Sequence, residues 1–189
     1  MIFCNSNNFK NGLKIVFNNI PFNIENSEFV KPGKGQTFVR VKMRNLINNK
    51  LIEKTFRSNE NLKVADIENI KISFLYRSEE IFYFINLKNY NEISIEKKFL
   101  KNVLSFIVPG KKYFGLIWNN KLISVVPKNF INLKVIGFDQ FSKNKLNYKN
   151  KLAILKTRLK VIVPSFIKIN DIIKIDTRSS KYISRKNNK

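Results

Sequence analysis

The feature of this sequence that most constrains its fold is an alternation of apolar and charged side chains with a period of two. In residues 37–45 one set of alternate positions is apolar, namely Val39, Val41 and Met43. The positions between them hold Phe38, Arg40, Lys42 and Arg44. Successive side chains of a β-strand point to opposite faces, so this pattern predicts a strand with one buried face. Similar short runs recur at residues 13–17, 51–56, 70–76, 81–85, 113–118, 122–126, 130–137, 159–163, 172–176 and 182–185.

Turn-forming residues separate these runs, among them Asn18-Asn19, Pro109-Gly110 and Asn119-Asn120. Many short strands at close spacing are typical of small antiparallel barrels rather than of alternating strands and helices. We therefore predict an all-β chain with a single helical turn at residues 95–101, where Ile95 and Phe99 would share a face.

Two breaks suggest a division of the chain into three units. The first is the polar bridge at residues 58–63 and the second is Pro127-Lys128-Asn129. The predicted domains are residues 1–64, 65–128 and 129–189. Each has only about 60 residues, which is near the lower limit for an independent core.

The residue counts exclude several kinds of chemistry. The 189 residues include no histidine and one cysteine, Cys4. These counts exclude a Ser-His-Asp or Cys-His nucleophile and an internal disulfide. They also exclude a zinc site with histidine ligands or with four cysteine ligands. No run approaches the roughly 18 apolar residues that span a bilayer, and polar residues at positions 5–8 argue against a signal peptide. We expect a cytoplasmic, non-enzymatic monomer without metal or cofactor.

The net charge of +23, from 36 basic and 13 acidic residues, has two interpretations. Residues with A/T-rich codons (Lys, Asn, Ile and Phe) dominate the composition, so much of the lysine could reflect mutational drift. The other interpretation is a polyanionic partner, because Lys and Arg supply most of the affinity for nucleic-acid phosphates. The predicted domains carry +7, +4 and +12. Drift should act evenly, so this imbalance favours two phosphate-binding ends.

The segment Phe29–Thr37 carries the strongest functional signal. Lys34 stands between Gly33 and Gly35, after Pro32 and before Gln36, with strand-like residues on both sides. Pro fixes one backbone angle and Gly frees its neighbours, which predicts a thin hairpin tip with one long cation. An ordinary solvated hairpin tip remains an alternative. A phosphate-binding P-loop does not, because that motif requires Ser or Thr after the lysine and then a helix.

Several motifs resemble bacterial translation elongation factor P. They are Asn11-Gly12-Leu13-Lys14-Ile15, the segment 28–36, Arg40 to Leu46, Glu53-Lys54-Thr55-Phe56, and Lys174 to Arg178 followed by Tyr182 to Arg185. The resemblance covers essentially the whole chain and is weaker in the middle third.

This resemblance implies an SH3-like (KOW-like) domain followed by two OB-like barrels in an elongated L shape. It implies binding to the ribosome and to the P-site peptidyl-tRNA, between the P and exit sites, and stimulation of peptide bond formation at stalled, typically polyproline, sequences. The tip Pro32, Gly33, Lys34, Gly35 and Gln36 would reach the tRNA acceptor end. Lys34 would be open to modification, of which β-lysylation by a β-lysine ligase is one known form.

Chemistry at the residue level is compatible with this role. The ribosome owns the catalytic centre, so the protein need only orient a poorly reacting substrate. A tenfold rate gain requires about 1.4 kcal/mol, and one charge-assisted hydrogen bond is worth roughly 1.5–3 kcal/mol. One well-placed amine at Lys34 could supply that stabilisation by positioning alone.

Two further patches are candidate RNA phosphate contacts. The first is Arg40, Lys42 and Arg44, which could equally be a solvated sheet face. The second, implied by the resemblance, is Arg178, Tyr182 and Arg185, of which Tyr182 could equally be core packing. The loop Lys143–Lys151 departs from the family, because it lacks the glycines assigned there to the exit-site codon, and that role is not transferred.

Two other functions remain open. A permanent ribosomal or other RNA-scaffolding protein would explain the charge but not the glycine-flanked lysine. The elongation-factor-P-like paralogue differs mainly at the loop tip, where Lys34 after Pro32-Gly33 favours the principal factor.

Overall fold

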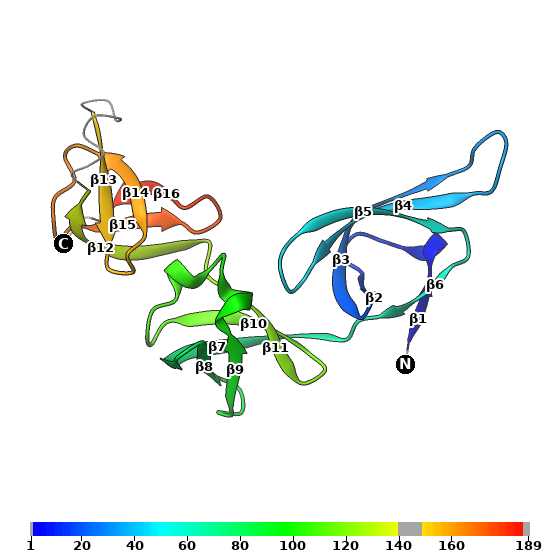
Figure 1. The fold of residues 1–189 in the computed structure, drawn as a ribbon, viewed down its shortest axis with the longest axis horizontal. Helices are drawn as coiled ribbons and strands as arrows, with labels where there is room; N and C mark the ends of the chain where they lie inside the picture. Colours follow the sequence, from blue (N-terminus) through cyan, green and yellow to red (C-terminus); the bar gives the residue numbers. More distant parts are fainter. Residues whose placement is uncertain (1, 140–148, 187–189) are drawn as a thin grey trace. The chain divides into compact units, whose positions relative to one another are not determined.

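A computed structural model of the chain describes residues 2–139 and 149–186, which form three β-sheets joined by turns (Figure 1). The all-β prediction is confirmed. The chain divides into two compact units. One comprises Met1–Ile70, Ile93–Ile95 and Gly115–Ser124, and the other Lys71–Glu92, Glu96–Phe114 and Val125–Lys189. The domain boundaries predicted from the sequence, and the L shape, stay predictions.

The first sheet is antiparallel throughout, with strand order β1-β6-β2-β3-β4-β5. Its strands are β1 (Phe3–Asn5), β2 (Lys14–Phe17), β3 (Ile20–Val30), β4 (Phe38–Asn45), β5 (Leu51–Arg57) and β6 (Asn61–Val64). The short 3-10 helix η1 (Ser6–Asn8) follows β1. The Ser6 hydroxyl donates to the Arg57 carbonyl at 2.8 Å, so the end of β5 is tied back to the end of β1. This bond draws the two edges of the curled sheet together.

The core of the first sheet is formed by the apolar face predicted for β4. Val39, Val41 and Met43 are buried, as the period of two requires. The Phe56 ring of β5 packs edge-on against those of Phe9 and Phe17, with ring centroids 5.7 and 5.6 Å apart. Such T-shaped pairs add to the stabilisation that burial alone provides.

The second sheet has the order β11-β10-β7-β8-β9. Its strands are β7 (Ile67–Ser78), β8 (Ile81–Asn86), β9 (Glu92–Glu96), β10 (Lys112–Trp118) and β11 (Lys121–Val126). Between β9 and β10 lie two 3-10 helices, η2 (Lys97–Leu100) and η3 (Leu104–Phe106). Tyr113 of β10 is buried, and its hydroxyl accepts from the Val108 amide at 2.7 Å and donates to the Phe106 carbonyl at 3.0 Å. This tyrosine therefore fixes the loop that carries η3.

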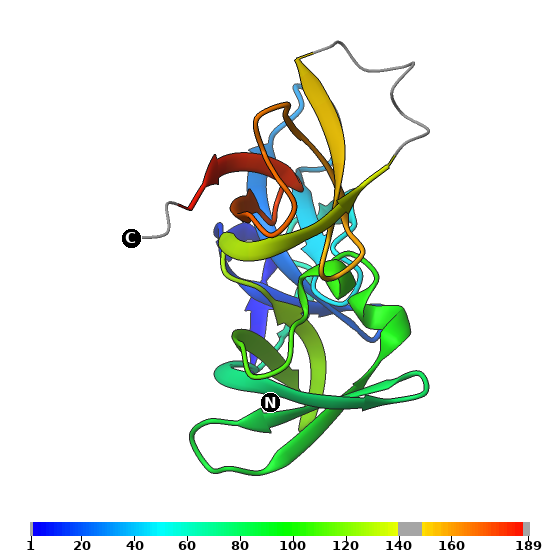
Figure 2. The ribbon, with the colours of Figure 1, turned by 90° about the vertical axis from the view of Figure 1, so that its left-hand side faces the viewer.

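The third sheet is antiparallel, with the order β14-β13-β12-β15-β16. Its strands are the yellow to red ribbons of Figure 2. Its strands are β12 (Phe130–Phe138), β13 (Asn150–Leu155), β14 (Lys160–Pro164), β15 (Ile172–Asp176) and β16 (Lys181–Arg185). The edge strands β14 and β16 also contact each other, so the sheet curls into a barrel. Phe106 of η3 packs among its core residues, which include Val135, Leu155 and Ile175.

Tight turns in this fold rely on asparagine in left-handed backbone conformations. Asn18 and Asn19 have φ of 50° and 57° between β2 and β3, and Asn119 and Asn120 have φ of 49° and 59° between β10 and β11. Two consecutive positive φ values are the signature of the turn that matches the twist of a hairpin. The predicted turn positions are therefore confirmed with their physical reason.

Several sequence predictions are wrong in detail. The bridge at 58–63 is not a simple linker, because it includes the first residues of β6, which pairs with β1 and β2. The helical turn is the 3-10 helix η2, and Ile95 is buried whereas Phe99 is 37% exposed, so they do not share a buried face. β1, β3, β6, β9 and β13 were absent from the predicted strands. Their asparagine, serine and glutamate residues, or their shortness, hide the alternation.

Candidate nucleic-acid interface

The candidate interface is built on the long hairpin of β3 and β4. These strands pair from Phe22 with Asn45 to Val30 with Phe38, and the loop of residues 31–37 projects beyond the last pair (Figure 1). A register shift between Ile24 and Asn26 marks a β-bulge in β3, which increases the local twist and bends the strand. The bulge directly follows Asn23, the last residue of β3 that pairs with β2.

The predicted tip is confirmed as an exposed loop without regular structure. Gly33, Lys34, Gly35 and Gln36 are exposed, and Pro32 is half-buried. The two glycines differ: Gly35 has φ of +107°, which L residues rarely adopt, whereas Gly33 does not have a positive φ. Glycine is therefore required by the backbone at position 35 and not at position 33.

The Lys34 side chain is exposed at the tip of the loop. Within residues 2–139 and 149–186 the Lys34 side chain has neither an ion pair nor a hydrogen bond. A Cβ placed on Gly33 would meet no heavy atom within 4 Å, so the space beside the lysine is also open. The side chain can therefore extend from the loop in many directions.

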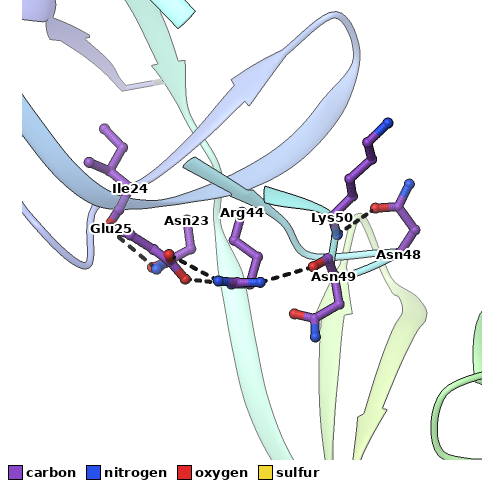
Figure 3. Close-up of polar contacts among 7 residues, drawn as sticks. All are labelled: Asn23, Ile24, Glu25, Arg44, Asn48, Asn49 and Lys50. Carbon is purple, nitrogen blue, oxygen red and sulfur yellow. Dashed lines mark hydrogen bonds and ion pairs between the residues drawn. The ribbon is translucent and has the colours of Figure 1, made fainter. Parts of the chain in front are cut away.

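Arg44 is held by a carboxylate rather than projecting freely. Its guanidinium donates two parallel hydrogen bonds to Glu25 in the β-bulge, with Nη2 and Oε2 3.0 Å apart, and a third to the Asn49 carbonyl at 3.1 Å (Figure 3). Hydrogen bonding to Arg44 lowers the pKa of Glu25, and the same contact raises the pKa of Arg44. Arg44 thus braces the bulge against the turn after β4.

Arg40 and Lys42 lie on the same exposed face and are paired more loosely. Arg40 is 3.8 Å from Glu28 on β3 and 3.6 Å from Glu53 on β5, and Lys42 is 3.8 Å from Glu53. These exposed pairs are long, and such pairs contribute about 0–1 kcal/mol each. The sequence predicted the three cations on one face but missed their carboxylates, because pairing across strands depends on register.

At the other end of the chain, Arg178 is also tied to a carboxylate. Asp176 accepts from the Arg178 backbone amide at 2.9 Å and from its Nε and Nη2 at 3.1 and 2.8 Å. These hydrogen bonds lower the pKa of Asp176 to about 2. The neighbouring Thr177 hydroxyl donates to the Lys128 carbonyl at 3.0 Å. The motif Asp176-Thr177-Arg178 therefore fixes the β15–β16 turn against the start of β12.

Tyr182 and Arg185 of β16 have different surroundings. Tyr182 is half-buried and packs against the core of the third sheet, which supports core packing over RNA contact. Arg185 is 3.8 Å from Asp171 and lies over the Phe166 ring at 5.8 Å from its centroid. Its charge stays partly exposed.

Other predictions about sites are limited by the described range. Most of the loop Lys143–Lys151, residues 143–148, lies outside the described residues. Among residues 2–139 and 149–186, no group of three or more His, Cys, Asp or Glu side chains could hold a metal ion. In the same residues no helix has the length and apolar character needed to cross a bilayer. Sequence reasoning passed over Phe29, an exposed aromatic ring beside the tip.

Comparison with known proteins places the whole chain in one family. Three family models match: the elongation factor P KOW-like domain at residues 5–62, the elongation factor P OB domain at 67–125 and the elongation factor P C-terminal domain at 131–185. Elongation factor P of Buchnera aphidicola subsp. Acyrthosiphon pisum (strain APS) is 46% identical over 182 residues, covering 95% of this chain and 96% of the relative. Its counterpart from Buchnera aphidicola subsp. Baizongia pistaciae (strain Bp) is 40% identical over 187 residues, covering 98% of this chain and 99% of the relative.

A solved structure shares the fold. Eukaryotic translation initiation factor 5A from Methanococcus jannaschii superposes with a TM-score of 0.50 at 17% identity, covering 66% of this chain and 94% of that one. At this level of identity the likeness concerns the fold alone.

Proposed function

This chain belongs to the elongation factor P family of translation factors, and we propose that it binds the ribosome beside the P-site peptidyl-tRNA. There it stimulates peptide bond formation where synthesis stalls, above all at consecutive prolines. It acts in the cytoplasm, as a monomer, by positioning the substrate rather than by acid–base chemistry.

The single observation that carries this proposal is the free amine of Lys34 on a slender, glycine-flanked loop. The loop of residues 31–37, which alone projects beyond the paired strands, can enter a crevice in RNA that a barrel cannot. In such a crevice the amine can donate up to three hydrogen bonds to phosphate, ribose or carbonyl oxygens of the tRNA acceptor end. Those bonds would hold the acceptor end in a reactive orientation.

The exposed side chains on the hairpin face divide into two roles. Arg40 and Lys42 have long, weak ion pairs, so RNA phosphates can replace Glu28 and Glu53 as their partners at small cost. Arg44 makes a compact two-pronged contact with Glu25, and we assign it to holding the hairpin in position. At the other end, Arg185 is proposed as a phosphate contact, whereas Arg178 stabilises its own turn.

Lys34 is also the proposed site of modification. Its side chain is exposed and the space beside Gly33 is open, which suits access by an enzyme of the β-lysine ligase type, and an added β-lysyl group would extend its reach. A mass increase confined to the peptide that contains Lys34, in protein isolated from its own cells, would identify that modification.

The test of the function is a reconstituted translation assay on a message that encodes three consecutive prolines. Lys34→Ala should leave the circular dichroism spectrum and melting temperature unchanged. It should lower the rate of Pro-Pro bond formation by about tenfold or more, because one charge-assisted hydrogen bond is worth roughly 1.5–3 kcal/mol. The matched control Lys31→Ala removes the same charge from an exposed lysine of the same loop and should keep most of the activity.

Equal activity of Lys34→Ala and the unaltered protein would refute the proposed role of the tip. Washing ribosomes with high salt provides a second check. A factor held by exposed cations should dissociate, whereas a permanent scaffolding protein would remain bound in equal proportion to the ribosomes.

A further inference from the structure

A cavity of about 800 Å³ lies within the second compact unit, which does not contain the Lys34 tip; Lys186, the residue after Arg185, belongs to its lining. It is lined by the loop around η3, the start of β10, and β12 with Lys128 just before it. Lys156, Thr157, Ile172 and Lys186 complete the lining. Its size lies in the range of small-molecule sites, which is about 300–1,000 Å³.

The charge around this cavity is of one sign. Six lysines line it, and none of the described lining residues is acidic; the six are Lys111, Lys112, Lys128, Lys134, Lys156 and Lys186. In the described part of the chain none of these six amines has a carboxylate partner. By contrast, Arg40, Lys42, Arg44, Arg178 and Arg185 all have one.

Such an arrangement raises the local concentration of anions. Like charges around a concave, partly apolar wall focus the electrostatic potential inside it. The wall includes the apolar or aromatic residues Phe106, Ile107, Tyr113 and Phe130. A ligand that suits it has several negative charges and one planar or apolar part.

An unsatisfied hydroxyl supports the same conclusion. Thr157 lines the cavity, and its Oγ1 atom is buried without a hydrogen-bond partner in the described structure. Buried polar groups in folded proteins nearly always have partners, and an exception calls for an explanation. Because this atom is closed to solvent in the free protein, a bound ligand with hydrogen-bonding oxygens would supply a partner after rotation of the Thr157 side chain.

We propose that this cavity binds a nucleotide with two or more phosphates. Its phosphates are held by the lysines, each of which offers three donors, and its base or sugar lies against the apolar wall. This site is independent of Lys34, so it can be present or absent whatever the tip does.

The experiment is isothermal titration calorimetry of the full chain with ADP at fixed ionic strength, with adenosine as the phosphate-free comparison. One variant replaces Lys111, Lys134 and Lys156 by Gln. The matched control replaces Lys71, Lys88 and Lys121 by Gln, three exposed lysines outside the cavity, so both lose three charges. We expect one saturable site for ADP and no binding of adenosine. The dissociation constant for ADP should rise at least about tenfold in the first variant and less than about twofold in the control.

Thr157→Val provides a second test, in which the stability of the free protein and its affinity for ADP should change in opposite directions. Removing an unsatisfied hydroxyl should raise the melting temperature of the free protein, while ADP binding weakens because the hydroxyl no longer contributes. No saturable ADP binding, or equal weakening in both triple variants, would overturn the proposal. Displacement of ADP by a single-stranded RNA oligomer would also overturn it, if the RNA acts at a lower concentration of phosphate groups than ADP needs to saturate the site. The cavity would then be an RNA-binding site.

Discussion

Replacing Phe106 by alanine tests how the third sheet obtains its core. Phe106 belongs to η3, between the strands of the second sheet, yet it is only 3% exposed and packs among the core side chains of the third sheet. A buried phenylalanine removes about 200 Å² from water. At roughly 25 cal/mol per Å² that is about 5 kcal/mol, and measured Phe→Ala changes in cores cost about 3–5 kcal/mol. We expect Phe106→Ala to destabilise the third sheet by that amount.

The assay is native-state amide hydrogen exchange, since it reports the opening free energy of each sheet separately. Protection of the amides in β12 and β15 should fall, while that in β3 and β4 of the first sheet should be unchanged. Phe114→Ala is the matched control, because Phe114 is 47% exposed on β10 and its loss should cost about 1 kcal/mol. The reasoning would be refuted if both variants lowered the opening free energy of the third sheet equally, or if Phe106→Ala lowered it by less than about 1 kcal/mol.

Two further predictions concern the tip and the C-terminal turn. Gly35→Ala forces an L residue into φ near +107°, so it should distort the tip and reduce stimulation at proline runs. Gly33→Ala, whose added Cβ meets no atom within 4 Å, should act like the unaltered protein. The translation assay with three consecutive prolines compares both variants, and an equal loss of activity would contradict the distinction. The pKa of Asp176 is lowered from its ordinary 3.8 to about 2, so its contribution to stability is present above pH 3.8 and is lost as the pH falls towards 2. Asp176→Asn should therefore flatten the decline of melting temperature over that window; an unchanged slope would show that the Arg178 contact contributes nothing.

The local parts of the structure were predictable from sequence because their cause is local. The alternation in residues 37–45 gave β4 and its buried face, and the glycine-flanked Lys34 gave the exposed tip. The difference between Gly33 and Gly35 could not be predicted, because it depends on backbone angles in the folded loop.

Features that join distant residues were beyond sequence reasoning. The Glu25–Arg44 contact requires the β-bulge and the register of β3 with β4. The burial of Phe106 and the cluster of six lysines depend on segments up to 75 residues apart, from Lys111 to Lys186, which no window of sequence brings together. The candidate site was therefore predicted in its tip and missed in its supporting contacts.

The asparagine turns have a consequence for how this protein tolerates its unusual composition. In the part of the chain that the structure describes, seven of the eleven residues other than glycine with positive φ are asparagine. Glycine codons are rich in G and asparagine codons are rich in A, so a genome that drifts towards A and T exchanges the first for the second. Asparagine is the side chain that enters the left-handed region most readily after glycine. Such a substitution preserves the hairpins at little energetic cost, and a strongly biased genome can thus still encode the sixteen strands found in residues 2–139 and 149–186.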